Sequence, residues 1–387
     1  MLLRVLLLLI VFVPHFAIAQ ERTVQIGLLR DRTVKKVVVM GDGGKCDIHI
    51  DGVKKGELKA SDGLRIETAE NGMSARSLSV SYRARRSIEI IPQDDGGFRM
   101  KATDHPVEER PYSGSLKVQR SKTGLLLVDR VPLEDYIGGV IQAEAGKRQH
   151  LEYYKLQAVS CRTYALSNLR KHQGDGFQLC DGVHCQVYHG ITRHDTILQA
   201  IDATRGLVLV DANIRLIHST FHSNCGGETV NAEEVWSKSE PYLRAITDTF
   251  CLAAPHSSWS RSLTRAEWLG YLKKKFSLLP QPDQLEALLN YEPSCRDLYL
   301  GNTWPLVPLK QVREDLKLNS TFFSVRTKGD EVLLEGRGFG HGVGLCQEGS
   351  MRMARSGRSY IDILHHYYSN VHLVDLSTLD FFRDRND

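Results

Sequence analysis

The sequence lacks the features that mark nucleic-acid-binding and membrane-spanning proteins. Its 50 Lys and Arg residues nearly balance 46 Asp and Glu residues, and no Lys/Arg run or basic stripe interleaved with aromatic residues occurs. This balance gives no support to a nucleic-acid partner. After residue 20 no apolar run reaches the roughly 20 residues that span a bilayer. Internal repeats and low-complexity linkers are also missing, so a fibrous or disordered chain is excluded.

One long apolar run is present, at the N-terminus. Residues 1–19 carry a single basic residue, Arg4, followed by an apolar stretch and the small-x-small sequence AIA. This order predicts a signal peptide that is cleaved before Gln20, and the run is shorter than a spanning helix. Its removal would lower the formal charge from +4 to +3. We therefore expect an exported protein, periplasmic or extracellular, with no transmembrane span in its mature form.

Cysteine is well represented, with eight residues. In an exported chain this number usually predicts disulfides. Cys180 and Cys185 enclose a histidine, whereas three other cysteines lie inside dense polar motifs (Cys161, Cys225 and Cys346). The spacing alone does not fix which cysteines form disulfides.

The order of hydrophobic patterns predicts an α+β fold with a β-rich N-terminal region. Residues 20 to about 125 alternate in short runs such as TVQIGLL and SLSVSYRA, broken by Gly, Asp and Asn, as in antiparallel strands. GSLKVQRSKTGLLLVDRVPLEDYI then predicts a hairpin that leads into a helix, with Pro132 in its first turn. Later strands are expected at GLVLVD, LIHSTFHS and FFSVRTK, and helices at TRAEWLGYLKKKF and SYIDILHHYYSN.

The segment from His150 to Lys171 contains neither Gly nor Pro and predicts an amphipathic helix. Its apolar residues recur at intervals of three and four, and Arg162 falls on this apolar stripe. A guanidinium in that position must be paired with an anion or face a cleft.

Residues 336–354, GRGFGHGVGLCQEGSMRMA, concentrate six glycines around His341. The Gly-Lys-Ser/Thr ending of a Walker loop is missing, and no repeating βαβ pattern surrounds the segment. Phosphate binding is therefore disfavoured, which leaves a tight corner or a ligand-facing loop.

Six motifs in order carry a resemblance to a known family. They are VPLEDYIGGVIQAEAG, LQAVSCRTYA, HCQVYHG, HSNCGGETVNAEEVW with PYLRAI, VREDLKLNSTFF, and the glycine-rich segment through SYIDILHHYYSN. Together they resemble the SpoIID/LytB family, which comprises the peptidoglycan lytic transglycosylases of sporulation and the related amidase enhancers. The resemblance implies a mixed core at residues 112–372, with a helix-rich segment at about 257–300. It leaves 20–111 as an N-terminal β domain and 373–387 as a tail.

The resemblance assigns roles to several residues. Glu144, in QAEAG, matches the family's general acid and base, and its pKa must be raised by apolar neighbours such as Ile141, Ala143 and Ala145. The family usually has Met where this chain has Ala145. Arg162 matches the arginine of RTYA and would hold a sugar acetamide or orient the glutamate, unless it forms a buried structural ion pair.

Three further residues are expected beside the substrate. Thr229 and Tyr242 match positions that line the family's cleft, where a hydroxyl and an aromatic ring suit sugars. His341 belongs to the loop beside the groove, and a satisfied structural histidine is favoured over a proton-transfer role.

Some family members bind zinc in the segment HQGDGFQLCDGVHCQVYHG. Here Cys180, His184 and Cys185 are candidate ligands, with His172 as a fourth. A structural Zn²⁺ is favoured slightly over a disulfide between the two cysteines, although an adjacent His and Cys reach one ion only if the loop curls.

Two functions from different classes remain. The first is a secreted lytic transglycosylase that acts on peptidoglycan glycan strands, including strands already stripped of stem peptides. The second is a non-catalytic wall-binding module that stimulates an N-acetylmuramoyl-L-alanine amidase. A zinc hydrolase at Cys180, His184 and Cys185 is weaker, because the sequence identifies no base for it.

Overall fold

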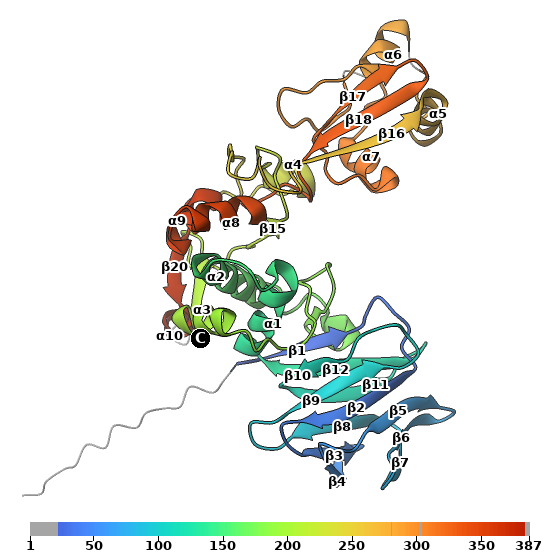
Figure 1. Cartoon of the computed structure of the whole chain (residues 1–387), viewed down its shortest axis with the longest axis vertical. Coiled ribbons are helices and arrows are strands. Elements are labelled where there is room, and N and C mark those ends of the chain that lie inside the picture. The colour runs from blue at the N-terminus through green and yellow to red at the C-terminus, as the bar shows by residue number, and fades with distance from the viewer. Residues whose placement is uncertain (1–21, 280, 302–303, 384–387) are drawn as a thin grey trace, which may run out of the picture.

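A computed structural model describes residues 22–383 except 280 and 302–303. The predicted signal peptide lies outside these residues. The chain forms three parts in a row: a β body, a helical layer and a projecting subdomain at the far end (Figure 1). Strands and helices segregate in this way in α+β proteins, so the predicted fold class is confirmed.

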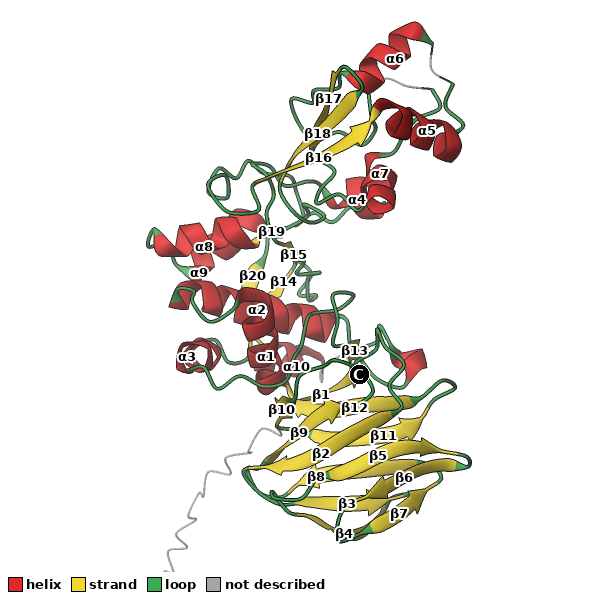
Figure 2. Cartoon of the chain, turned by 45° about the vertical axis from the view of Figure 1, so that its right-hand side comes forward, coloured by secondary structure: helices red, strands yellow, loops and turns green. Residues whose placement is uncertain are grey.

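The β body consists of two mainly antiparallel sheets packed face to face (Figure 2). Alternate residues of its strands are buried, as in β2 and β3, so both inner faces contribute to one core. The first sheet has the order β13-β1-β12-β11-β8-β3-β4. Its strands are β1 Thr23–Leu28, β3 Cys46–Ile50, β4 Val53–Leu58, β8 Ser87–Pro92, β11 Ser115–Arg120, β12 Leu125–Pro132 and β13 Leu179–Cys180. The second sheet, β10-β9-β2-β5-β6-β7, contains β2 Lys36–Asp42, β5 Leu64–Ala69, β6 Gly72–Arg76, β7 Ser81–Ala84, β9 Gly97–Ala102 and β10 Arg110–Tyr112.

The boundary expected at residue 112 is wrong. The predicted hairpin forms as β11 and β12, but both strands lie inside the N-terminal sheet, where β12 pairs with β1 over six residues. Backbone hydrogen bonding to β1 and β8 therefore extends the β body to Pro132. β13 joins the same sheet through parallel pairing with β1, so a segment far along the chain is anchored on it.

The helical layer is built around one buried helix, α2. The layer comprises α1 Leu133–Ala145, α2 Leu151–Ser167, η1 Gln173–Asp175, α3 Asp195–Ala203, α4 Ala232–Trp236, α8 Gln347–Arg355, α9 Tyr360–Tyr367 and α10 Leu376–Arg383, with the short strands β14 Leu207–Val210, β15 Phe221–His222, β19 Leu345–Cys346 and β20 His372–Asp375. α2 begins after His150, as predicted, but ends at Ser167 rather than Lys171. The side chains of Ser167 and Asn168 donate to the Tyr164 carbonyl and so compete with continued helical bonding.

The projecting subdomain interrupts the helical layer and has a core of its own. It contains β16 Ser258–Thr264, α5 Arg265–Phe276, α6 Pro282–Leu289, α7 Leu309–Leu316, β17 Phe323–Lys328 and β18 Glu331–Arg337. Its three strands form an antiparallel sheet in the order β16-β18-β17. The predicted helix-rich segment at 257–300 thus belongs to a separate unit whose two ends return to the helical layer.

The C-terminal segment is not the tail that the sequence suggested. Residues 372–375 form β20, which pairs antiparallel with β14, and α10 follows directly. Among the strands expected at GLVLVD and LIHSTFHS, the first forms as β14, whereas the second is reduced to the two residues of β15. No helix within residues 22–383, apart from the three omitted positions, is long and apolar enough to cross a membrane.

Candidate functional site

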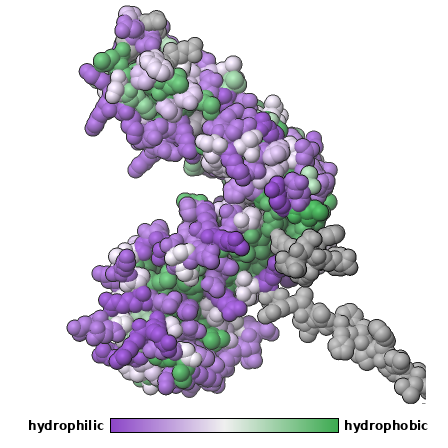
Figure 3. Space-filling model, turned by 180° about the vertical axis from the view of Figure 1, so that it is seen from behind, coloured by the Kyte–Doolittle hydropathy of each residue, from purple (hydrophilic) through white to green (hydrophobic). Residues whose placement is uncertain are grey.

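A cavity of about 750 Å³ lies between the helical layer and the projecting subdomain. Figure 3 shows the molecule from behind as a bent body with a hollow on its inner side, between its two ends. Glu144 and His341 both line this cavity. The remaining wall comes from distant segments, among them Val183–Gln186, His218–Ser223, Trp236, Arg313 and Gln347.

Glu144 is the one carboxylate among the residues that line the cavity. Its side chain is half-buried in the last turn of α1, and its Oε1 accepts the Val187 N–H at 2.9 Å. Burial raises the pKa of Glu144 above its ordinary value, and the Val187 hydrogen bond opposes this only in part. The negative end of the α1 dipole also favours the protonated acid. The carboxyl group therefore holds its proton to a higher pH than an ordinary exposed glutamate does, as a general acid requires.

The apolar setting of Glu144 does not come from its neighbours in sequence alone, as the sequence suggested. Glu144 lies close enough to the buried Tyr153 and Cys161, both on α2, for its charge to raise the pKa of each. α2 packs directly against α1, so it closes one side of the carboxyl group. The backbone at Val187 also contacts the carboxyl group, through its N–H.

Two adjacent glycines let this backbone approach α1. A Cβ at Gly139 would lie 2.1 Å from the Gly190 carbonyl oxygen, and a Cβ at Gly138 would lie 2.9 Å from a methyl group of Thr192. Any larger residue would push the segment from Gln186 to Thr192 away from the helix. The YIGGV sequence thus holds the Val187 N–H within reach of Glu144.

His341 lines the cavity but has no free ring nitrogen. Its Nδ1 accepts the Val343 N–H at 3.1 Å, and its Nε2–H donates to the Phe221 carbonyl at 3.0 Å. Burial lowers the pKa of His341 to about 4, so the ring is neutral. Its ring packs against Trp236, with centroids 5.2 Å apart. These contacts make His341 part of the cavity wall rather than a proton carrier.

Two cavity-wall side chains bury a polar atom that has no partner. In the described part of the chain, Gln347 Nε2 and His222 Nε2 form no hydrogen bond. Buried polar atoms are usually paired, so these nitrogens leave hydrogen-bonding capacity beside the cavity.

Thr229 and Tyr242 do not line the cavity. Thr229 is buried, and its hydroxyl accepts the Ile246 N–H at 2.9 Å. The Tyr242 hydroxyl accepts the N–H of His218 at 3.1 Å, and His218 is the residue that reaches the cavity. Tyr242 therefore supports the wall from behind, whereas Thr229 bonds to a segment that does not line the cavity.

Arg162 also lies away from the cavity, in a buried ion pair. Its side chain is fully buried and donates to both carboxylate oxygens of Glu134, with Nε to Oε1 at 2.8 Å and Nη2 to Oε2 at 2.5 Å. Nη1 donates to the Leu207 carbonyl at 3.0 Å. The guanidinium thus joins α2, α1 and β14, which is the structural alternative that the sequence left open.

The four candidate zinc ligands come together. Donor atoms of His172, Cys180, His184 and Cys185 all lie within 4.8 Å of one another. The loop that carries these residues is anchored at Cys180, which lies in β13 and pairs with Gly27 of β1. His172 Nδ1 bonds to Asp175 Oδ2 at 2.8 Å, which aims Nε2 at the cluster as in carboxylate–histidine–metal arrangements. Two sulfurs and two imidazoles fit tetrahedral Zn²⁺.

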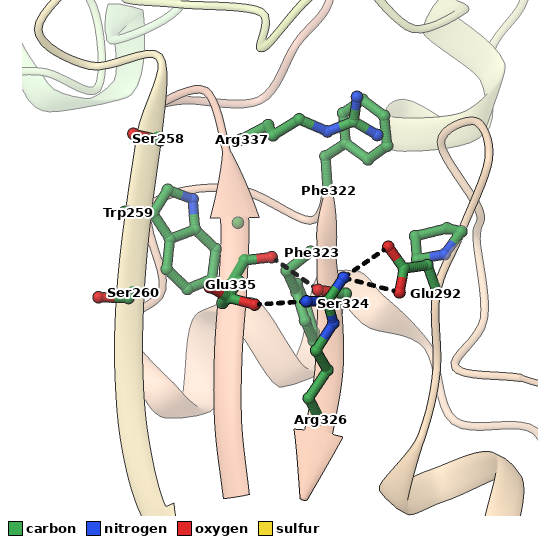
Figure 4. A pocket seen from close by; sticks show the side chains of 12 residues that line it. Ser258, Trp259, Ser260, Glu292, Phe322, Phe323, Ser324, Arg326, Glu335 and Arg337 are labelled. Carbon is green, nitrogen blue, oxygen red and sulfur yellow. Dashed lines mark hydrogen bonds and ion pairs between the residues drawn. The ribbon is translucent and has the colours of Figure 1, made fainter.

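A second cavity, about 780 Å³, lies on the sheet of the projecting subdomain. Figure 4 shows that three of its charged side chains are paired: Arg326 bonds to both Glu292 and Glu335. Arg337 stacks on Phe322, with its guanidinium carbon 3.8 Å from the ring centroid. All of these residues come from the subdomain, so this cavity is separate from the Glu144 site.

Sequence reasoning missed a second group of metal-type ligands. Cys225, Asp248, Cys251 and Cys346 are all buried and converge on one point. The sequence showed that Cys225 and Cys346 lie in polar motifs, but 121 residues separate them. Only the pairing of β15 with β19 brings these two motifs together.

Comparisons with known proteins place the chain among cell-wall-related relatives. The family model described as "Stage II sporulation protein" matches residues 121–210, which include Glu144 and the His172 to Cys185 cluster. Stage II sporulation protein D of Bacillus subtilis is 29% identical over 305 residues, covering 75% of this chain and 84% of that protein. An uncharacterised protein of Brachyspira hyodysenteriae is 28% identical over 306 residues, covering 75% and 78%. The amidase enhancer of Bacillus subtilis is 26% identical over 290 residues, covering 61% and 40%. By its motifs and by these matches, the chain is similar to proteins of the SpoIID/LytB family.

Proposed function

We propose that this protein is an exported lytic transglycosylase that cleaves the glycosidic bond between N-acetylmuramic acid and N-acetylglucosamine in peptidoglycan strands. The observation that carries the proposal is the position of Glu144, a half-buried acid with a raised pKa in the wall of the cavity. Similarity to the SpoIID/LytB family supports the substrate class.

One carboxyl group suffices for this reaction. The protonated Glu144 donates its proton to the glycosidic oxygen as the bond from that oxygen to C1 of the muramic acid breaks. The resulting carboxylate then accepts the proton of the C6 hydroxyl while O6 bonds to C1. The product is a 1,6-anhydro sugar, no water is consumed, and Glu144 returns to its acid form. Since the nucleophile belongs to the substrate, the second carboxylate of ordinary glycosidases is not needed.

The remaining residues of the site have supporting roles in this proposal. Trp236, which is exposed at the cavity, presents a ring face for sugar stacking, and His341 packs against it. A Zn²⁺ held by His172, Cys180, His184 and Cys185 would fix the loop that carries Val183–Gln186 along the cavity edge. Its role is structural, because Glu144 carries the proton transfer.

The test compares the mature chain with Glu144→Gln on intact and on peptide-stripped glycan strands, with products identified by mass spectrometry. We expect 1,6-anhydro products from the unaltered chain and a loss of at least about 100-fold in Glu144→Gln, the usual scale of general acid and base catalysis. Glu108→Gln is the matched control, since Glu108 is exposed in the β body, and it should keep full activity.

The pH profile provides a second readout. Because the raised pKa of Glu144 belongs to a group that must be protonated for the first step, activity should fall as the pH rises through that pKa. If folded protein binds glycan but releases no anhydro product from either substrate, the enzyme proposal is wrong. Stimulation of a wall amidase by the same protein would then favour the binding module.

A further inference from the structure

We propose a second metal site, in which Cys225, Asp248, Cys251 and Cys346 bind a structural Zn²⁺ behind the wall of the Glu144 cavity. The four donor atoms lie within 4.8 Å of one another, and all four residues are buried. The nearest pairs are Cys225 Sγ to Cys251 Sγ at 3.3 Å and Cys225 Sγ to Asp248 Oδ2 at 3.4 Å. Zn–S bonds of about 2.3 Å in a tetrahedron separate sulfurs by about 3.8 Å, so small shifts complete the site.

Asp248 is the first argument for a cation. Its carboxylate is fully buried, and it accepts the Tyr367 hydroxyl at 2.7 Å and the Phe250 N–H at 2.9 Å. In the described part of the chain it forms no ion pair. Buried charges are paired or bind metals, and here the groups that converge on the carboxylate are thiols.

Backbone donors on the sulfurs are the second argument. Cys346 Sγ accepts the N–H of Cys225 at 3.3 Å and that of Gly349, in the first turn of α8, at 3.4 Å. The N–H groups of Gly226 and Gly227 also form hydrogen bonds to the Cys251 sulfur. N–H donors that point at sulfur stabilise thiolates, which are the form that binds metal.

Two neighbouring residues fit a cluster of net negative charge. Arg296 is half-buried and donates to the Cys225 carbonyl at 2.6 Å, yet within the described residues it forms no ion pair with a carboxylate. Three thiolates, one carboxylate and Zn²⁺ leave a charge of about −2, which a nearby guanidinium offsets. Gly349 makes room for the cluster, since a Cβ there would lie 2.3 Å from both Asp248 Oδ2 and the Tyr367 hydroxyl oxygen.

The site would join three segments that form the back of the cavity. Cys225 follows β15, Cys346 ends β19, and Cys251 closes the loop that begins at Asp248. Ser223 and Gln347, which line the cavity, are close neighbours of these ligands in sequence. A metal here would therefore hold the wall without touching the substrate.

Metal analysis of the mature chain tests the proposal without any assay of activity. Zinc per chain, measured by plasma mass spectrometry, should fall by one equivalent in Cys251→Ser. Cys295→Ser is the control, because Cys295 is exposed and outside both clusters, and its zinc content should not change. With Co²⁺ in place of zinc, Cys251→Ser should lose part of the sulfur-to-cobalt absorption.

A second background keeps the test decisive if Cys251→Ser fails to fold. The double variant Cys180→Ser with His184→Ala removes two ligands of the first cluster, and it should still retain about one zinc. No zinc in this background would overturn the proposal. So would a disulfide-linked peptide pair containing Cys225 and Cys251 in the unaltered chain, because a disulfide uses the sulfurs that the metal requires.

Discussion

The ion pair between Arg162 and Glu134 gives the sharpest test of how the helical layer is held together. Arg162 is fully buried and Glu134 is 12% exposed, so each charge depends on the other for compensation. Removing one partner of such a pair costs about 3–5 kcal/mol. Since about 1 kcal/mol shifts Tm by about 2–4 °C in a chain of a few hundred residues, Arg162→Met should lower Tm by about 10 °C.

Double-mutant analysis separates this structural role from a catalytic one. Arg162→Met, Glu134→Met and the double variant should be compared by thermal or urea unfolding. The double variant should cost clearly less than the sum of the single variants, because it leaves no uncompensated charge. It should also still release anhydro products if it is folded.

The result that refutes this reasoning is specific. A stable double variant without activity would place Arg162 in catalysis, as the family resemblance implied. Strictly additive losses in unfolding free energy would show that the contacts in the structure do not stabilise the fold as a pair.

Two further predictions concern the surroundings of Glu144. Because burial raises its pKa in the folded chain, ionised Glu144 reduces stability at every pH above its unfolded pKa of about 4.3. Glu144→Gln should therefore have the higher Tm at pH 7, with a gap that closes as the pH falls to 4; an equal or lower Tm at pH 7 would contradict the raised pKa. Gly139→Ala should lower Tm and activity together, because its Cβ would lie 2.1 Å from the Gly190 carbonyl oxygen. Gly270→Ala in α5 is its control, since no atom lies within 4 Å of that Cβ, and unchanged stability in Gly139→Ala would show that the helix contact is not tight.

Local patterns in the sequence determined much of the secondary structure. The alternation of apolar and polar residues predicted the N-terminal strands, and the three- and four-residue spacing of apolar residues predicted α2. The same spacing placed Arg162 on a buried face, where it lies. Glu144 and the four ligands of the first cluster were identified from motifs close together in the chain, and the structure places Glu144 in the cavity and brings the ligands together.

Contacts between distant segments were decided only by the tertiary structure. Pairing of β12 with β1 moved the domain boundary, and pairing of β20 with β14 turned the expected tail into part of the fold. The apolar setting of Glu144 depends on α2 and on the segment at Val187, neither of which adjoins it in sequence. The second metal-type cluster joins residues 225 and 346 because two short strands lie side by side. Periodicity reports which face of an element is buried, whereas hydrogen bonding and packing across the fold decide which faces meet.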